Sequence, residues 1–150
     1  FKIQTTTSGY GLFAHSGSSV ILGVMDFGAC VDAHISTYGG YITRGANYTI
    51  SAASAIHLDA ELSGLITTPF AGITITVSGT PAFSNSFALC GEGSQINDGQ
   101  STYSGSATGK RYDVYYGGII QTYGSGANNF PGDSAGTGTN YAASPYGLYL

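Results

Sequence analysis

The chain has 150 residues, including 24 Gly and 12 Tyr, and only four Lys or Arg and eight Asp or Glu residues carry formal charge. This length is typical of one domain, and its scarcity of good helix formers argues against a helical protein. The net charge of −4 leaves no basic surface for nucleic acid. No apolar run reaches the roughly 20 residues that cross a bilayer. We therefore expect an all-β domain that binds no nucleic acid and does not insert into a membrane.

A repeated order of residues runs along the chain, in which a short β-rich stretch leads through one or two glycines into a second such stretch. Aligning its glycines gives spacings of 23, 24, 29 and 25 residues, within the range of solenoid repeats. The repeat predicts a single-stranded parallel β-helix of about five coils over residues 1–123. The aligned glycines are Gly17, Gly40, Gly64, Gly93 and Gly118.

A further strand is expected after each of the first four glycine turns, at 24–28, 48–52, 73–78 and 101–104. Turn-forming clusters rich in Gly and Asn separate these stretches. In the third coil the alternation predicts that Ile56, Leu58, Ala60 and Leu62 face inward and that His57, Asp59 and Glu61 face outward. A β-sandwich or a jelly roll also uses short strands and Gly-rich turns, but neither requires this repeat.

The stretch 124–150 breaks the repeat and contains Pro131, Pro145 and several glycines. Because the last coil of a solenoid exposes an open edge and a cross-section of the core, we expect this stretch to be a loop-rich cap of the same domain. Cys30 and Cys90 would lie about two coils apart, near 10 Å at the usual strand spacing, which favours two separate thiols over a disulfide.

The segment SGSATGKRYDVYYGGIIQTYGSGANNFPGDSAGT, from Ser104 to Thr137, resembles the closing segment of phage-type tail spike and tail fibre proteins of the right-handed parallel β-helix class. The resemblance covers about a quarter of the chain. The preceding coils resemble these proteins only in the regular recurrence of short strands and turns. The resemblance implies a homotrimer on a virion, or an extracellular or cell-surface location, and contact with bacterial surface polysaccharide. The start at Phe1, without an initiator Met or a leader, suggests a processed product or part of a longer polypeptide.

The densest group of ionisable residues falls in the second and third coils. Aligning Val31 with Ile56 puts Asp32 and His34 beside His57 and Asp59. Glu61 follows two residues after Asp59 on the same expected face, at about 7 Å from the rise of a strand. Such a carboxyl pair could cleave a glycosidic bond, with His57 assisting, or it could collect a divalent cation. Alternatively, the whole group could merely solubilise the outer face.

Tyrosines provide the expected binding surface, because an exposed ring can stack on a sugar while its hydroxyl forms hydrogen bonds. Tyr115 is the best outward candidate of its coil, with Tyr112, Val114 and Tyr116 in the inward phase, and Tyr38 lies beside a predicted strand. Asp32 and His34 complete the candidate binding residues. No dinucleotide fingerprint or metal-ligand spacing occurs, so we expect no cofactor and no metal.

Three functions remain open from the sequence. The first is a structural, receptor-contacting segment of a viral tail spike or fibre that binds host surface glycan. The second is a polysaccharide-degrading glycoside hydrolase or lyase that uses Asp59, Glu61 and His57. The third is a self-assembling extracellular filament or surface protein whose coils stack end to end.

Overall fold

The computed structural model describes residues 1–69, 72–99, 101–138 and 147–150, whose strands form three parallel sheets. Sheet A contains β1 (Lys2–Ile3), β4 (Asp26–Phe27), β7 (Tyr48–Ile50), β10 (Ile73–Val77) and β13 (Ser101–Ser104). Sheet B contains β2 (Leu12–His15), β5 (Ala33–Tyr38), β8 (Ser54–Glu61), β11 (Ala82–Cys90) and β14 (Thr108–Val114). Sheet C contains β3 (Ser19–Leu22), β6 (Tyr41–Arg44), β9 (Leu65–Thr67), β12 (Gln95–Asn97), β15 (Ile119–Gln121) and β16 (Leu148–Tyr149).

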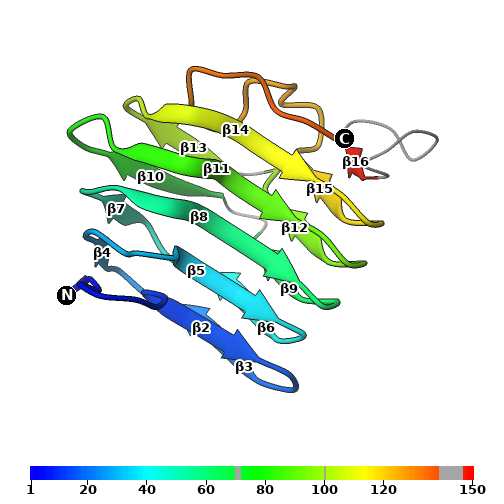
Figure 1. Cartoon of the computed structure of the whole chain (residues 1–150), viewed down its shortest axis with the longest axis horizontal. Helices are drawn as coiled ribbons and strands as arrows, with labels where there is room; N and C mark the ends of the chain where they lie inside the picture. Colours follow the sequence, from blue (N-terminus) through cyan, green and yellow to red (C-terminus); the bar gives the residue numbers. More distant parts are fainter. Residues whose placement is uncertain (70–71, 100, 139–146) are drawn as a thin grey trace.

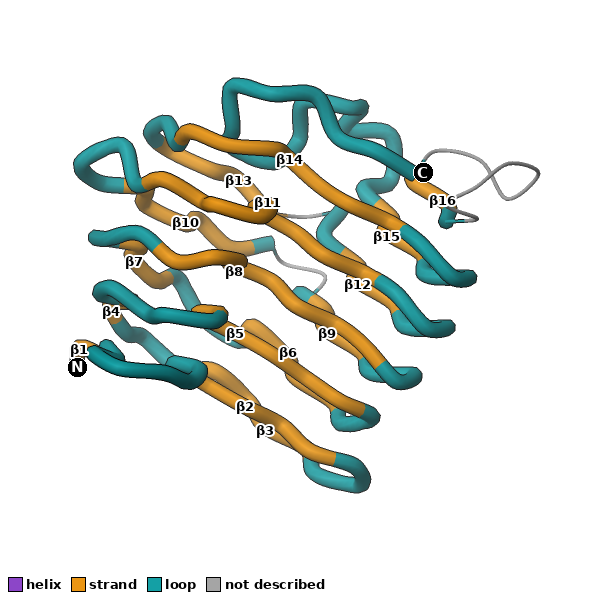
Figure 2. The backbone as a smooth tube through the Cα atoms, in the orientation of Figure 1, coloured by secondary structure: helices purple, strands orange, loops and turns teal. Residues whose placement is uncertain are grey.

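The chain passes through sheets A, B and C in turn, and each passage makes one coil of a β-solenoid. Five such coils stack from the blue N-terminal end towards the yellow fifth coil (Figure 1). Figure 2 shows strands joined by loops, with no helix among the described residues. The predicted parallel solenoid of about five coils is confirmed, and the antiparallel sandwich and jelly roll are excluded.

The glycine turns of the repeat join sheet B to sheet C. Backbone hydrogen bonds connect Tyr41 to Ser18, Leu65 to Gly40, Gln95 to Gly64 and Ile119 to Ser94. Gly40, Gly64 and Gly118 are therefore equivalent as predicted, whereas Ser18 and Ser94, rather than the preceding Gly17 and Gly93, occupy this place in coils 1 and 4. A Cβ at position 118 would lie 2.3 Å from the carbonyl oxygen of Cys90, so this turn requires Gly.

Apolar side chains at matching positions of successive coils build the core. In sheet C the register places the fully buried Ile42, Ile66, Ile96 and Ile120 directly above one another. Each coil therefore buries its apolar face against the coils before and after it, which is the energetic reason for the repeat. Cys30 and Cys90 are buried free thiols.

The middle of the interior is aromatic and contains two histidines. Nδ1 of His34 and Nδ1 of His57 are 3.0 Å apart, and Nε2 of His57 is 2.8 Å from the hydroxyl of Tyr48. The ring of His57 lies 4.8 Å from that of Phe87 and 6.2 Å from that of Phe83, measured between centroids. Both imidazoles are fully buried, so they belong to the core.

Acid is expected to destabilise the fold through these two histidines. Burial lowers the pKa of His34 from 6.5 to about 4, and burial followed by the charges of neighbouring groups lowers the pKa of His57 well below 6.5. The unfolded chain therefore takes up protons near pH 6.5 where the folded chain does not. The stabilising contribution is complete above pH 6.5 and is lost as the pH falls towards 4.

An NMR titration of the imidazole signals tests this expectation, with exposed His15 as the reference signal within the same molecule. His34 and His57 should remain neutral at pH 6 in the folded protein. Protonation of either ring above that pH without unfolding would contradict the prediction.

A buried ion pair ties together coils that are not neighbours. Arg44, at the end of β6 in coil 2, pairs with Asp98, which follows β12 in coil 4, and both side chains are fully buried. Asp98 also accepts hydrogen bonds from Ser101 at 2.7 Å, from Tyr103 at 3.0 Å and from Asn129 of the C-terminal stretch at 2.8 Å. The network thus reaches from coil 2 to residues beyond coil 5.

The C-terminal stretch forms part of a sixth turn over sheets B and C. Ser134 and Thr137 make parallel bridges to Lys110 and Asp113 of β14, and β16 pairs with β15. Phe130 is buried and stacks at 5.7 Å on Phe87, so it closes one end of the aromatic interior. Residues 139–146 of the expected cap, including Pro145, lie outside the described residues.

Candidate functional site

Sheet B departs from simple alternation at one position in three adjacent strands. The pairs His34–Ile35, His57–Leu58 and Phe87–Ala88 are all buried, and they lie in matching register facing the interior. The residues on either side face outward, where Ala33, Ile56 and Leu89 form a separate small apolar cluster. Two consecutive inward residues therefore reverse the phase of each strand.

Because of this reversal, the directions predicted for the side chains of the third coil are only partly correct. Leu58 and Ala60 face inward and Asp59 and Glu61 face outward, as expected. Ile56 lines the outer face and His57 lies inside, each opposite to the expectation. Leu62 is 57% exposed in a turn, where its φ of 53° takes it out of the strand.

The register between coils 2 and 3 also differs from the expected one by two residues. Ala33, not Val31, pairs with Ile56. His34 therefore lies next to His57 inside the solenoid, and Ser36 lies next to Asp59 on the outside. The prediction that Asp32 and His34 flank His57 and Asp59 on one face is wrong for both histidines.

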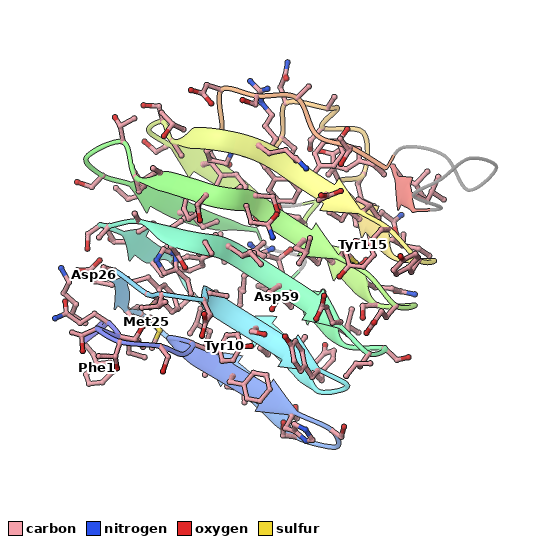
Figure 3. All side chains as sticks on the ribbon, viewed as in Figure 1. Phe1, Tyr10, Met25, Asp26, Asp59 and Tyr115 are labelled. Carbon is pink, nitrogen blue, oxygen red and sulfur yellow. The ribbon has the colours of Figure 1, made fainter. Side chains whose placement is uncertain are left out.

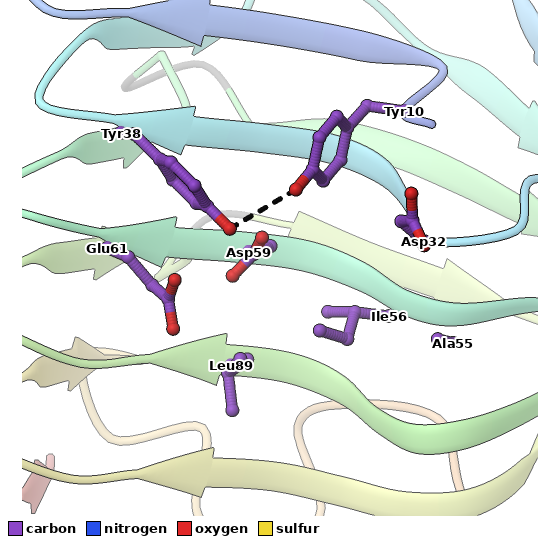
Figure 4. Close-up of a pocket in the computed structure, with 8 residues that line it drawn as sticks. All are labelled: Tyr10, Asp32, Tyr38, Ala55, Ile56, Asp59, Glu61 and Leu89. Carbon is purple, nitrogen blue, oxygen red and sulfur yellow. Dashed lines mark hydrogen bonds between the residues drawn. The ribbon is translucent and has the colours of Figure 1, made fainter. Parts of the chain in front are cut away.

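An open pocket of about 250 Å³ lies on the outer face of sheet B (Figure 4). It is lined by Tyr10, Asp32, Tyr38, Ala55, Ile56, Asp59, Glu61 and Leu89. The lining residues come from coils 1 to 4, so the flat stack of strands presents them side by side. Figure 3 labels Tyr10, Asp59 and Tyr115, which belong to coils 1, 3 and 5 of the stack.

Asp59 is the most unusual residue in the pocket because it carries a carboxyl and yet is only 3% exposed. Its Oδ2 accepts a hydrogen bond from the hydroxyl of Ser36 at 2.8 Å, whereas its buried Oδ1 has no hydrogen-bond partner. Burial, reinforced by the neighbouring Glu61, raises the pKa of Asp59 from 3.8 to about 7. A carboxyl with a free acceptor in a pocket is suited to receive a donor from a ligand.

Tyr10 and Tyr38 form the aromatic wall of the pocket. Their hydroxyl oxygens are 3.2 Å apart, drawn as the dashed line in Figure 4, and this hydrogen bond, together with burial, raises the pKa of Tyr38. Tyr10 lies in the loop before β2, where the backbone N–H of Gly9 donates to Oδ2 of Asp32 at 2.7 Å. Gly9 has a φ of 102°, so a residue with a side chain would strain this turn. Asp32 therefore positions the tyrosine loop.

Tyr115 reaches the site across the neighbouring coil. Its hydroxyl donates a hydrogen bond to Oε1 of Glu61, and its ring occupies the space above Gly91, where a Cβ would lie 2.4 Å from Cζ. Burial, followed by this hydrogen bond, raises the pKa of Tyr115. Tyr115 faces outward and Tyr112 and Val114 are buried, as predicted, but Tyr116 is 68% exposed in a turn rather than inward.

The structure thus brings five of the predicted site residues together and separates two. Asp32, Tyr38, Asp59 and Glu61 line the pocket and Tyr115 adjoins it, while His34 and His57 lie inside. Tyr10, Ser36, Ile56 and Leu89 were not among the predicted residues. Tyr10 precedes its strand, and the other three could be found only with the correct register and phase.

Within the described residues, no three His, Cys, Asp or Glu side chains come together as a metal site. That part of the chain also contains no helix long and apolar enough to span a membrane. Comparisons with protein-family models, with curated proteins and with solved structures find no match to this chain.

Proposed function

We propose that the outer face of sheet B binds a saccharide and that the chain is the receptor-contacting segment of a viral, phage-like tail spike or fibre. One observation carries the binding proposal: Asp59, which lines an open pocket with a tyrosine wall, is almost fully buried and has a carboxyl oxygen without a hydrogen-bond partner. Carboxylates accept hydrogen bonds from sugar hydroxyls, and Tyr rings with Ile56 and Leu89 offer apolar contact to the sugar ring.

The assignment to a particle appendage has a separate basis, which is the resemblance of residues 104–137 to tail spike and tail fibre proteins. It carries with it the proposals of a homotrimer, of a virion or cell-surface location and of bacterial polysaccharide as the receptor. Light scattering on the purified chain separates a trimer from the end-to-end filament. A defined mass of three chains supports the appendage, whereas open-ended growth supports the filament.

A glycan microarray of bacterial surface polysaccharides tests saccharide binding. The labelled chain should bind at least one polysaccharide, and Tyr38→Ala should reduce the retained signal about tenfold, because it removes both a ring face and the partner of Tyr10. Tyr123→Ala is the matched control, since Tyr123 is 63% exposed and lies outside the pocket. Binding that survives Tyr38→Ala, or no binding to any polysaccharide, would contradict the proposal.

Polysaccharide cleavage is the second candidate function, and the raised pKa of Asp59 favours it. A carboxyl with a pKa of about 7 can hold a proton near neutral pH, as the general acid of a glycosidase must. Glu61, about 7 Å further along the strand, would be the second carboxyl. His57 cannot contact a substrate in the pocket because its ring lies in the interior. Release of reducing sugar by the wild type, but not by Asp59→Asn combined with Glu61→Gln, would establish this function instead.

A further inference from the structure

The pocket on sheet B combines three carboxyls with no cation. Asp32, Asp59 and Glu61 line it, and neither Lys nor Arg does. The chain has only four Lys and Arg residues, and each interacts elsewhere. Lys2 pairs with Asp26, Arg44 with Asp98 and Lys110 with Asp113, while Arg111 donates to the carbonyl of Ser134.

The protein's own contacts leave the pocket carboxyls incompletely paired. Oδ2 of Asp32 accepts from Gly9, Oε1 of Glu61 accepts from Tyr115, and Oδ2 of Asp59 accepts from Ser36. These donors are all neutral, and none reaches the buried Oδ1 of Asp59. A buried carboxylate is costly unless a positive charge or a proton accompanies it. The complementary ligand would supply that charge.

The residues that line the pocket indicate which kind of cation it would bind. A metal ion needs several converging ligands, and the described residues contain no such group of three or more. An organic ammonium instead donates hydrogen bonds to carboxylates and is attracted to aromatic faces such as those of Tyr10 and Tyr38. The pocket, at about 250 Å³, is below the usual size of a site for a drug-sized ligand, which suits one sugar unit.

We propose that this pocket selects saccharides with a free amino group, in which the ammonium group meets Asp59 and Glu61 and the sugar ring lies against the tyrosine wall. This inference rests on the proposed saccharide binding and specifies its ligand class. A lysine side chain carries the same ammonium, but it is a slender chain that offers no ring or hydroxyls to Tyr10, Tyr38 and Leu89. The site therefore favours an amino sugar over a basic peptide.

Isothermal titration calorimetry at pH 7.5 with three oligosaccharides of equal length tests the selectivity. Oligomers of glucosamine should bind about tenfold more tightly than oligomers of N-acetylglucosamine, and oligogalacturonate should bind least. Asp59→Asn should remove the preference for the free amine. Asp113→Asn is the matched control, because it removes the same charge from the same face one strand beyond Leu89 and should keep the preference.

Each other outcome has a separate meaning. If oligomers of glucosamine and of N-acetylglucosamine bind the wild type equally and neither binds Asp59→Asn, the amine selectivity would be overturned and the saccharide site supported. If Asp59→Asn keeps the preference for the free amine, that preference comes from the overall negative charge of the chain, and the proposal would be overturned. A trilysine peptide that binds as tightly as the amino sugar would overturn the saccharide part. No binding of any oligosaccharide would overturn both this inference and the proposed function.

Discussion

Replacing Asp59 by Asn is expected to raise the free energy of unfolding at pH 8 while it removes the preference for a free amine in the ligand. The wild-type carboxyl must ionise although Asp59 is only 3% exposed and Oδ1 has no hydrogen-bond partner. Its pKa of about 7, against 3.8 without the fold, corresponds to a penalty on the order of 2 to 4 kcal/mol. Asn keeps an acceptor for the hydroxyl of Ser36 without the charge.

The effect should depend on pH in a defined direction. Below pH 3.8 the carboxyl is protonated in both the folded and the unfolded chain, so Asp59 adds no penalty. Between pH 3.8 and 7 the unfolded chain loses its proton first, which makes the folded wild type progressively less stable. Above pH 7 the penalty is constant. The advantage of Asp59→Asn should therefore grow from pH 4 to pH 7 and then level off.

Urea unfolding of both proteins between pH 4 and pH 8 measures this difference and cancels the contribution of the two histidines, which the proteins share. Asp113→Asn should instead be neutral or slightly destabilising, by about 0 to 1 kcal/mol, because it breaks a partly exposed pair with Lys110. An Asp59→Asn protein that is less stable than the wild type at pH 8 would show that the carboxylate is satisfied, and the argument for a ligand at Oδ1 would fail.

Replacing Arg44 by Met is expected to lower the free energy of unfolding by about 3 to 5 kcal/mol. The guanidinium is fully buried, pairs with Asp98 and donates to the hydroxyl of Tyr103 at 3.2 Å. Burial alone would lower the pKa of Arg44, but Asp98 raises it well above its ordinary value. Without Arg44, the charge of Asp98 would remain in the interior with neutral donors only.

Two further variants separate the loss of the ion pair from the loss of side-chain volume. Lys2→Met removes a surface cation that is 3.5 Å from Asp26, and should cost about 0 to 1 kcal/mol. Arg44→Met combined with Asp98→Leu should recover part of the stability that Arg44→Met loses, because no charge is left uncompensated. If urea unfolding shows the double variant to be less stable than Arg44→Met, an unpaired Asp98 is not the cause.

The coil architecture could be predicted from the sequence because it is encoded locally and repeatedly. The glycines at positions 40, 64 and 118 mark equivalent turns, since a side chain there would collide with the backbone of the preceding coil. The expected strands at 48–52, 73–78 and 101–104 overlap β7, β10 and β13. Ser18 and Ser94 show how a residue other than Gly at this turn shifts the apparent alignment by one position.

The arrangement of the site was only partly predictable. Asp59 and Glu61 follow the alternation that begins at Leu58, so their outward direction could be predicted correctly. The consecutive inward pair His57–Leu58 has no signature in a pattern of apolar and polar residues, because His reads as a surface residue. Its place in the core becomes clear only when the neighbouring rings of Phe27, Tyr48 and Phe87 are known.

Long-range contacts explain the rest of what the sequence did not reveal. Arg44 and Asp98 are 54 residues apart, and no local pattern links them. Tyr115 and Glu61 are also 54 residues apart and meet only because Gly91, on the coil between them, leaves room for the ring. Such contacts depend on the register of whole coils, which a repeat fixes only to within one or two residues.

The alternation in sheet B separates the residues that maintain the solenoid from those that would contact a ligand. Ile35, Leu58 and Ala88 hold the interior, while Ser36, Asp59 and Leu89, their immediate neighbours in sequence, form an outward column. A new ligand preference could therefore evolve by single substitutions along that column without rebuilding the scaffold. The outer face of sheet B can thus diversify while the interior residues keep the fold constant.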